Sequence, residues 1–311
     1  MSKETLIQTI NLCKFFGKRK ILDNLNLNVQ SGDIYGFLGK NGSGKTTTIK
    51  MLLGLIHANS GIISLNGYNI KTDFKKAILQ VGAIVENPCF YSYLTGKENL
   101  NLIVNLYPGL SKNRIEEVLE CVELKDRAND KVKTYSLGMK QRLGIAMALV
   151  NNPKLVILDE PTNGLDPQGI REIKEIVLKL SKEMGITFFI SSHLLNEVEQ
   201  ICTKVGILQD GKLLIEDNIN KLLNTDIEVL EICTSDTNKT RSVLESLPYI
   251  KSSKISAKGI IVEILKGNSA NLNQFLLFEG IVVEHLIPQN NYLEKLFFKI
   301  TEGGIANDRV S

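Results

Sequence analysis

The sequence lacks the long apolar runs of a membrane protein. No segment approaches the roughly 20 apolar residues that a membrane-spanning helix needs, and the first residues, Met-Ser-Lys-Glu, begin no apolar export segment. The net charge of +3 is too small to indicate adhesion to nucleic acid or to a membrane surface. We therefore expect a globular chain that does not itself span a membrane, is not exported and does not bind nucleic acid.

Cysteine is also scarce, and its placement argues against disulfides and zinc sites. The five cysteines are odd in number and scattered without Cys-x-x-Cys spacing, so we expect small buried apolar residues in a reducing compartment. Glycine, proline and serine show no bias. With 43% hydrophobic and 23% charged residues, the 311-residue chain is long enough for a sizeable core and a second domain.

A glycine-rich loop is the most specific motif present. Residues 39–46 read Gly-Lys-Asn-Gly-Ser-Gly-Lys-Thr, between an apolar segment at 34–38 and a predicted helix that opens at Lys45. The backbone N–H groups of such a loop hold α- and β-phosphates, while Lys45 reaches the β- and γ-phosphate oxygens and the Thr46 hydroxyl binds Mg²⁺. The residues predicted to bind nucleotide here are Gly39, Lys40, Asn41, Gly42, Ser43, Gly44, Lys45, Thr46 and Thr47.

Two apolar segments end in side chains suited to phosphate chemistry. The run Leu-Val-Ile-Leu at 155–158 is followed by two acids, which indicates a buried parallel strand that brings carboxylates to its C-terminal edge. Asp159 would hold Mg²⁺ directly or through water, and Glu160 would polarise the attacking water. The segment 186–193 is predicted to be a strand ending in His193, one of only three histidines, where the γ-phosphate would be.

A second surface able to face phosphate precedes these strands. Tyr-Ser-Leu-Gly-Met-Lys-Gln-Arg at 135–142 opens an apolar helix. Ser136 and Gly138 would lie at its positive end. Downstream, the residues Asn-Gly-Leu-Asp-Pro at 163–167 form a predicted loop that contains Asp166.

Five motifs in this order resemble the ATP-binding-cassette (ABC) family of ATPases, from about Ile7 to Leu223. The resemblance implies an α/β fold: an ABC-type P-loop nucleotide-binding domain at 1–223, with a parallel core sheet, an antiparallel β-subdomain and a helical subdomain at about 86–143. It implies ATP hydrolysis with Mg²⁺. In this family the phosphate loop of one subunit and the signature serine of another close on one ATP, so a single cassette implies a head-to-tail homodimer.

The resemblance assigns roles to three further residues, each with a simpler alternative. Phe16 falls where an aromatic ring stacks on adenine, although it could be an ordinary core residue. Asp166 falls where a loop couples the two sites, and His193 where a residue senses the γ-phosphate. His193 could instead be a satisfied residue at a strand end, and Glu160 a helix-capping acid.

Two departures from the common family pattern stand out. Glu86 replaces a glutamine that touches Mg²⁺ and faces the transport partner; a carboxylate can ligate Mg²⁺, although Glu86 could also be a solvated loop acid. With the Asn-Pro-Cys-Phe-Tyr stretch that follows, it resembles the bacitracin-resistance and lantibiotic-immunity ATPases of bacteria. The second departure is Leu137 and Met139 in the signature, which retains its phosphate-facing serine and glycine.

The motifs stop after Leu223 and the pattern changes. Residues 224–302 predict the order β-α-β-β-α-β of a ferredoxin-like α+β domain with one helix appended at 292–301, and 303–311 is predicted to be a flexible tail. Nothing in the domain indicates chemistry. We expect an accessory domain that extends the dimer or contacts a partner, rather than a ligand sensor.

The predicted function is the ATP-hydrolysing subunit of a bacterial exporter for resistance or immunity to an antimicrobial peptide or antibiotic. It would work at the cytoplasmic face of the membrane through a separate permease. An exporter of a drug, a lipid or sodium is an alternative, as is a soluble ABC ATPase acting on ribosomes or DNA. Against the latter, only about ninety residues separate the phosphate loop from the signature, without long coiled coils, and one cassette is present.

Overall fold

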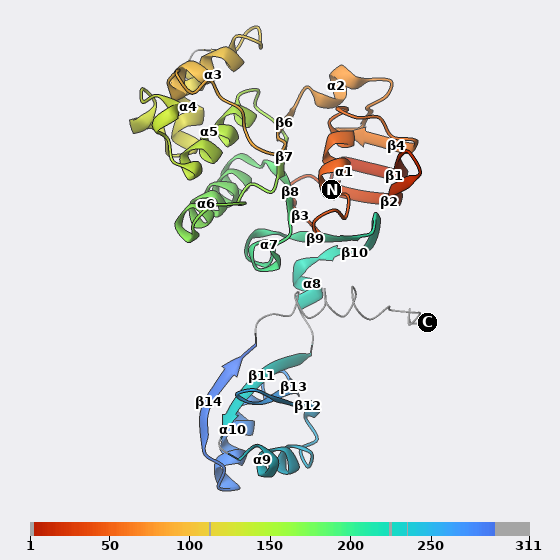
Figure 1. Ribbon diagram of the computed structural model, residues 1–311, viewed down its shortest axis with the longest axis vertical. Helices are drawn as coiled ribbons and strands as arrows, with labels where there is room; N and C mark the ends of the chain where they lie inside the picture. The colour runs from red at the N-terminus through yellow and green to blue at the C-terminus, as the bar shows by residue number, and fades with distance from the viewer. Residues whose placement is uncertain (1–2, 112, 224–225, 235, 290–311) are drawn as a thin grey trace. The chain divides into compact units, whose positions relative to one another are not determined.

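The computed structural model describes residues 3–111, 113–223, 226–234 and 236–289 (Figure 1). The chain divides into two compact units, Met1–Ile219 and Asn220–Ser311. The division lies four residues before the boundary at 223 that the end of the motifs predicts.

An antiparallel sheet forms one side of the first unit, with the strand order β2-β1-β4-β5. Its strands are β1 (Thr5–Phe16), β2 (Arg19–Gln30), β4 (Ser60–Leu65) and β5 (Tyr68–Asn69). Apolar residues at positions 7, 10 and 12, at 25, 27 and 29, and at 62, 63 and 65 predict the first three of these strands. The two-residue strand β5 is too short to produce an alternating pattern of its own.

A second, mainly parallel sheet has the strand order β10-β9-β3-β8-β7-β6, and only β10 is antiparallel to its neighbour. The strands are β3 (Ile34–Leu38), β6 (Val81–Ile84), β7 (Leu155–Asp159), β8 (Thr187–Ser192), β9 (Lys204–Gln209) and β10 (Lys212–Asn218). Every residue of β3, β7 and β8 is buried, which explains why β3 and β7 are apolar almost without interruption.

Helices accompany both sheets of the first unit. They are α1 (Lys45–Leu52), α2 (Phe74–Ile78), α3 (Gly96–Val104), α4 (Asn113–Cys121), α5 (Leu137–Leu149), α6 (Pro167–Met184) and α7 (Leu195–Ile201), with short 3₁₀ turns at Lys125–Arg127 and Val132–Thr134. Helix α8 (Ile219–Leu223) begins at the last residue of this unit and continues into the second. Helices α3, α4 and α5 lie together (Figure 1). Buried Arg114 of α4 joins this group to the end of α5, where it donates to the carbonyls of Leu149 (2.6 Å) and Val150 (3.2 Å).

The core of the first unit joins the two sheets. Leu6, Ile7 and Leu25 of the antiparallel sheet belong to the same buried cluster as Phe37 and Phe189 of the parallel sheet. The rings of Phe37 and Phe189 are 5.2 Å apart. This burial is the main term that holds the phosphate loop and the strand ends in a fixed arrangement.

The second unit has the strand order β12-β13-β11-β14, antiparallel throughout. Its elements are β11 (Ile227–Thr234), α9 (Thr237–Leu244), β12 (Ile250–Ser256), β13 (Gly259–Leu265), α10 (Ser269–Phe278) and β14 (Val283–Pro288). The predicted ferredoxin-like order is therefore confirmed. The predicted helix at 292–301 and the tail at 303–311 lie outside the described residues.

The cysteines are all free, but they are not all buried. Cys13, Cys202 and Cys233 are buried as expected, Cys121 is intermediate, and burial raises the pKa of the Cys202 thiol. Cys89 is exposed, so the prediction was wrong for this residue. In the part of the chain that the structure describes, no helix has the length and apolar character needed to cross a membrane.

Candidate nucleotide-binding site

Three strand ends of the parallel sheet bring the main motifs together. Leu38 at the end of β3 pairs with Ser192 of β8, and Asp159 at the end of β7 pairs with Ser191. The glycine-rich loop, Glu160 and His193 directly follow these ends. Ligands of open α/β sheets bind beyond the carboxyl ends of the strands, and motifs more than a hundred residues apart in sequence meet at this edge.

The loop between β3 and α1 is shaped by glycine. Gly42 and Gly44 have φ angles of 80° and 113°, in the left-handed region where a side chain is strained, and a Cβ on Gly44 would lie 2.7 Å from Leu22 Cδ2. No side chain caps α1 at its start, so its first N–H groups point toward the space that an anion would occupy.

A cavity of about 380 Å³ opens beside this helix start, within the size range of small-ligand sites. The predicted residues Asn41, Gly42, Gly44, Lys45, Thr46, Thr47 and Glu160 line it. Gly39 and Lys40 do not line the cavity; their carbonyl oxygens accept hydrogen bonds from Lys45 Nζ at 2.8 and 3.4 Å. Ser43 is buried, with a hydroxyl that has no hydrogen-bond partner in the described structure.

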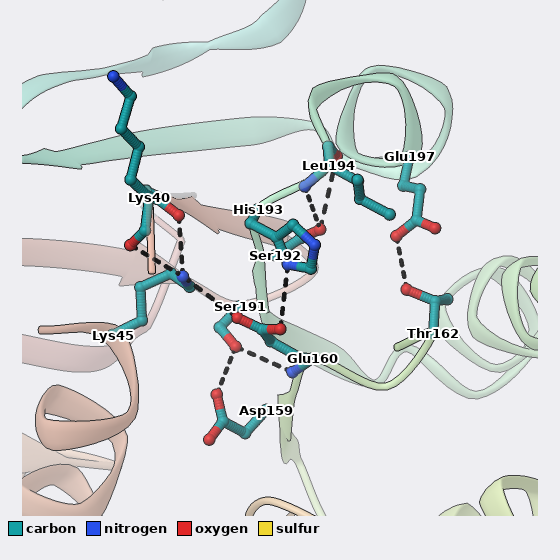
Figure 2. A network of polar contacts seen from close by, with 11 residues as sticks. Lys40, Lys45, Asp159, Glu160, Thr162, Ser191, Ser192, His193, Leu194 and Glu197 are labelled. Atoms are coloured by element: carbon teal, nitrogen blue, oxygen red, sulfur yellow. Dashed lines mark hydrogen bonds and ion pairs between the residues drawn. The ribbon is translucent and has the colours of Figure 1, made fainter. Parts of the chain in front are cut away.

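Lys45 forms an ion pair with the predicted general base. Its Nζ lies 3.2 Å from Glu160 Oε1, and its side chain is only 4% exposed (Figure 2). The other Glu160 oxygen, Oε2, lies 3.0 Å from His193 Nδ1. Glu160 therefore contacts the predicted phosphate-binding lysine through one oxygen and the predicted sensor histidine through the other.

Ser191 orients both acids, and the sequence analysis did not predict it. Its hydroxyl donates to Asp159 Oδ1 at 2.6 Å and accepts from the Glu160 backbone N–H at 2.9 Å. Glu160 has a φ of 47°, a left-handed conformation that costs a non-glycine residue about 1–3 kcal/mol and is found at functional sites. A polar residue two positions before the predicted histidine is the only signal that the sequence offers for Ser191.

Glu86, a predicted Mg²⁺ ligand, forms an ion pair with a lysine of α1. Its Oε1 lies 2.7 Å from Lys50 Nζ in the last turn of α1, and its side chain is 63% exposed. Glu86 also has a left-handed φ of 59°. The contact that the structure gives Glu86 is with Lys50, and not with Thr46 or Asp159.

Phe16 lies on the surface, so the alternative of a core residue is wrong. It is 53% exposed at the end of β1, and Lys14 Nζ lies 4.9 Å from its ring centroid. In the β1–β2 register its partner is Arg19. Arg19 and Ile21 line the loop cavity, although sequence motifs did not identify them; the only signal was a cation close to Phe16.

Ser136, Gly138 and Asp166 meet at a second, separate cavity of about 470 Å³. Ser136 Oγ accepts from the Met139 N–H at the start of α5, and Asp166 Oδ1 accepts from the Gly169 N–H at the start of α6. Both side chains therefore cap helices. Within one chain, the residues lining this cavity are distinct from those lining the loop cavity.

The oxygen donors beside the loop suit Mg²⁺. Thr46 supplies a hydroxyl in the cavity. Asp159, which directly precedes the cavity residue Glu160 in the chain, supplies a buried carboxylate. Among the described residues no cluster of three or more His, Cys, Asp or Glu side chains is placed to hold a metal. Mg²⁺ bound with nucleotide commonly takes one or two carboxylates together with phosphate oxygens and waters, so this donor set fits it.

Comparisons with known proteins agree with this arrangement. A family model described as ABC transporter matches residues 22–163. The chain is 46% identical to the bacitracin transport ATP-binding protein BcrA of Bacillus licheniformis over 96% of this chain and 98% of that protein. It is 41% identical to the lantibiotic transport ATP-binding protein SrtF of Streptococcus pyogenes over 71% of this chain and 97% of that protein.

A solved structure shares the fold of most of the chain. The dimeric post-hydrolysis structure of the ATP-binding cassette MJ0796 bound to ADP and Pi has a TM-score of 0.62 and 27% identity, and covers 69% of this chain and 99% of that chain. With the strand-end site described above, these matches establish the ATP-binding fold and its activity. The chain belongs to the family of ABC transporter ATP-binding proteins and is an ABC-type ATPase that binds ATP.

Proposed function

We propose that this ATPase is the nucleotide-binding subunit of an exporter that confers resistance to a peptide antibiotic of the bacitracin type. The observation that carries the proposal is the full-length match to a bacitracin transport ATP-binding protein, which spans 96% of this chain. It is supported by a site in which the predicted cation, base and sensor already contact one another.

The residues of the site suggest how hydrolysis proceeds. The N–H groups at the start of α1 and Lys45 bind the β- and γ-phosphates. Glu160 accepts the proton of the attacking water, and His193 holds the Glu160 carboxylate in place and contacts the γ-phosphate. Mg²⁺, held by Thr46 and Asp159, would neutralise the charge on the phosphate oxygens.

The two separate cavities support a dimer with composite sites. The loop cavity presents Lys45 and Glu160, whereas Ser136 and Gly138 line a different cavity of the same chain. One ATP would contact both sets if the loop cavity of one subunit faced the signature cavity of another. The dimeric structure of the MJ0796 cassette bound to ADP and Pi supports a dimer, and the head-to-tail arrangement is part of this proposal.

An exposed aromatic surface supports a permease partner. Tyr91 and Tyr93 are exposed, with ring centroids 5.9 Å apart. Asn99 of α3 bonds the Tyr91 backbone in both directions, and exposed Leu102 lies three residues further along that helix. This apolar surface begins five residues after Glu86. A permease helix seated on it would bring the protein to the cytoplasmic face of the membrane.

The second unit favours a bacitracin-type cargo over a lantibiotic. The match to SrtF covers 228 residues, about the length of the first unit, which ends at Ile219. The match to BcrA covers 301 residues and therefore includes most of the second unit. Export of a drug, a lipid or sodium remains the alternative, with the second unit serving as an accessory domain in either case.

The proposal is tested by purifying the partner. A tagged Glu160→Gln variant is trapped with ATP and Mg²⁺ in its own cells, membranes are solubilised in detergent, and bound proteins are identified by mass spectrometry. We expect a multi-span membrane protein in near-equal amount, and loss of bacitracin resistance when the chain is deleted. Recovery from the soluble fraction with ribosomes or DNA would overturn the transport proposal, and unchanged bacitracin sensitivity would overturn the cargo.

A further inference from the structure

A buried carboxylate outside the predicted motifs lies close to the catalytic strand ends. Glu197 is in the first turn of α7 and is only 8% exposed. Its Oε2 accepts a hydrogen bond from the Thr162 hydroxyl at 2.5 Å (Figure 2). Burying a carboxylate is costly unless it is paired or hydrogen-bonded. The bond to Thr162 connects α7, the helix that follows His193, to the segment that follows Glu160.

Thr162 lies in the loop that leaves the catalytic strand. The loop is tight: the Asn163 N–H donates to the Glu160 carbonyl at 3.1 Å, and the Leu165 N–H donates to the Thr162 carbonyl at 3.2 Å. A shift of Thr162 would therefore move the backbone of Glu160, two residues earlier. The same loop ends at Asp166, which caps α6.

Glu197 is held firmly on the opposite side. The Leu194 N–H donates to the Ser192 hydroxyl at 2.9 Å, and the Glu197 N–H donates to the Leu194 carbonyl at 3.3 Å. Helix α7 packs directly against β3, since a Cβ on Gly36 would lie 2.4 Å from Val198 Cγ1. The sheet thus fixes α7, and α7 fixes the Glu197 carboxylate.

The second oxygen of Glu197 has room for water. Oε1 has no hydrogen-bond partner among the described residues, and Thr162, Ser192 and Glu197 line a cavity of about 10 Å³. That is about the room that one internal water needs.

We propose that Glu197 is a positioning residue that acts through Thr162 to hold Glu160 and His193 in their catalytic arrangement. Glu160 has a left-handed φ of 47°, and such a conformation persists only when its surroundings over-determine it. Ser191 on β8 fixes the backbone N–H of Glu160. The Thr162–Glu197 bond fixes the chain after Glu160. Glu160 is thus held from two directions, by β8 through Ser191 and by α7 through Thr162.

This inference rests on the proposed roles of Glu160 and His193 in hydrolysis. It predicts that the Thr162–Glu197 bond affects turnover and not the binding of ATP, because neither residue lines the loop cavity. A small displacement of a catalytic group can lower a rate about a hundredfold. Loss of a supporting hydrogen bond to such a group commonly costs about 10-fold to 100-fold.

The test compares variants that keep or remove the bond at constant shape. In the full-length chain, Thr162→Val should lower kcat for ATP about 10-fold or more, with KM and the Mg²⁺-free ATP dissociation constant within about twofold of wild type. Thr162→Ser, which restores the hydroxyl, and Glu197→Gln, which keeps an acceptor oxygen, should recover most of kcat. Glu197→Leu should match Thr162→Val, and the double variant should lose no more than either.

Thr187→Val is the matched control. Thr187 is buried at the opposite end of β8, and its hydroxyl accepts a hydrogen bond from the Gly32 N–H at 2.8 Å. Thr187→Val removes a buried hydroxyl from the start of β8, at the opposite end of this strand from Ser192 and His193, and should leave kcat unchanged. Equal losses of kcat in Thr187→Val and Thr162→Val would reduce the effect to general destabilisation and overturn the proposal.

Glu160→Gln, measured in parallel, separates the two levels of inference. Normal turnover in Glu160→Gln would remove the proposed base, and the positioning role with it. Stalled turnover in Glu160→Gln together with normal kcat in Thr162→Val would overturn the positioning role alone. Multiplying losses in the double variant would also overturn it, because residues that act as one unit do not lose activity independently.

Discussion

Replacing Glu160 with glutamine should tighten ATP binding as well as stop hydrolysis. Among the residues that the structure describes, Lys45 Nζ has one charged partner, Glu160 Oε1 at 3.2 Å, and two carbonyl partners. The β- and γ-phosphates must compete with Glu160 for this ammonium group. In Glu160→Gln the competitor is neutral, and a negative charge that repels the phosphates is removed at the same time.

The size of the effect follows from the burial of the pair. A hydrogen bond to a charged group contributes about 1.5–3 kcal/mol net. Lys45 is 4% exposed but Glu160 is 22% exposed, so solvent weakens the pair and the lower value, about 1.5 kcal/mol, applies. Since 1.4 kcal/mol is about a factor of ten in affinity, the ATP dissociation constant should fall about tenfold. Loss of the general base should lower kcat at least about 100-fold.

The assay is isothermal titration calorimetry with ATP in the absence of Mg²⁺, which prevents turnover in the wild type. Intrinsic tryptophan fluorescence cannot replace it, because the chain has no tryptophan. Glu183→Gln, at an exposed position near the end of α6, makes the same change in net charge away from the loop cavity and should bind as wild type does.

Two results would refute this reasoning. Equal or weaker ATP binding by Glu160→Gln would mean that the Lys45–Glu160 pair does not compete with the phosphates. Full steady-state turnover would mean that Glu160 is not the base. The first result leaves the base assignment intact, and the second leaves the competition intact.

Three further changes have defined outcomes. Arg19→Ala should weaken ATP binding several-fold in the same titration, because the loop cavity loses a cation, whereas Lys18→Ala, at an exposed neighbour outside the lining, should not. Glu86→Gln should change the free energy of unfolding in urea by less than about 0.5 kcal/mol, because its pair with Lys50 is solvent-exposed; a larger loss would make the pair structural. Glu98 accepts from the backbone N–H of Thr95, which lowers the pKa of the Glu98 carboxyl. Its stabilisation of α3 is therefore complete above its unfolded pKa of about 4.3 and is lost as the pH falls through its lowered folded pKa. Hydrogen exchange of the first α3 amides should be faster in Glu98→Gln than in wild type at pH 6, and the difference should shrink as acid protonates Glu98; a difference that does not change on acidification would contradict the capping role.

Much of the fold was predictable because its signals are local. The run at 155–158 is apolar since β7 is buried on both faces, and the glycines at 42 and 44 are required by left-handed φ angles. The ferredoxin-like order was predictable because alternating strand and helix patterns with short turns leave few topologies. Strand β5, with two residues, carries no such pattern.

The contacts within the site were not predictable, because they join residues far apart in the chain. Ser191 lies 32 residues from Asp159, and Glu86 lies 36 residues from Lys50. The family resemblance implies that Glu86 lies near Mg²⁺, but the ion pair with Lys50 depends on how α1 and the segment after β6 pack. The Thr162–Glu197 bond could not be predicted for the same reason, and a lone acid in an amphipathic helix normally indicates a solvated face.

The Lys45–Glu160 contact also bears on the order of events in the cycle. While Lys45 is paired with Glu160, one oxygen of the proposed base is occupied, and the charge of the proposed phosphate-binding cation is neutralised. Phosphates that displace Glu160 from Lys45 leave its carboxylate with His193 alone, so the base becomes free to accept a proton only when a nucleotide is present. Polarising a water serves no purpose when no nucleotide is bound. If Lys45 must first release Glu160, the base becomes available only when the substrate arrives. The rate of hydrolysis should therefore depend on the ability of the nucleotide to reach Lys45, so that AMP, which has no β- or γ-phosphate, should not displace Glu160.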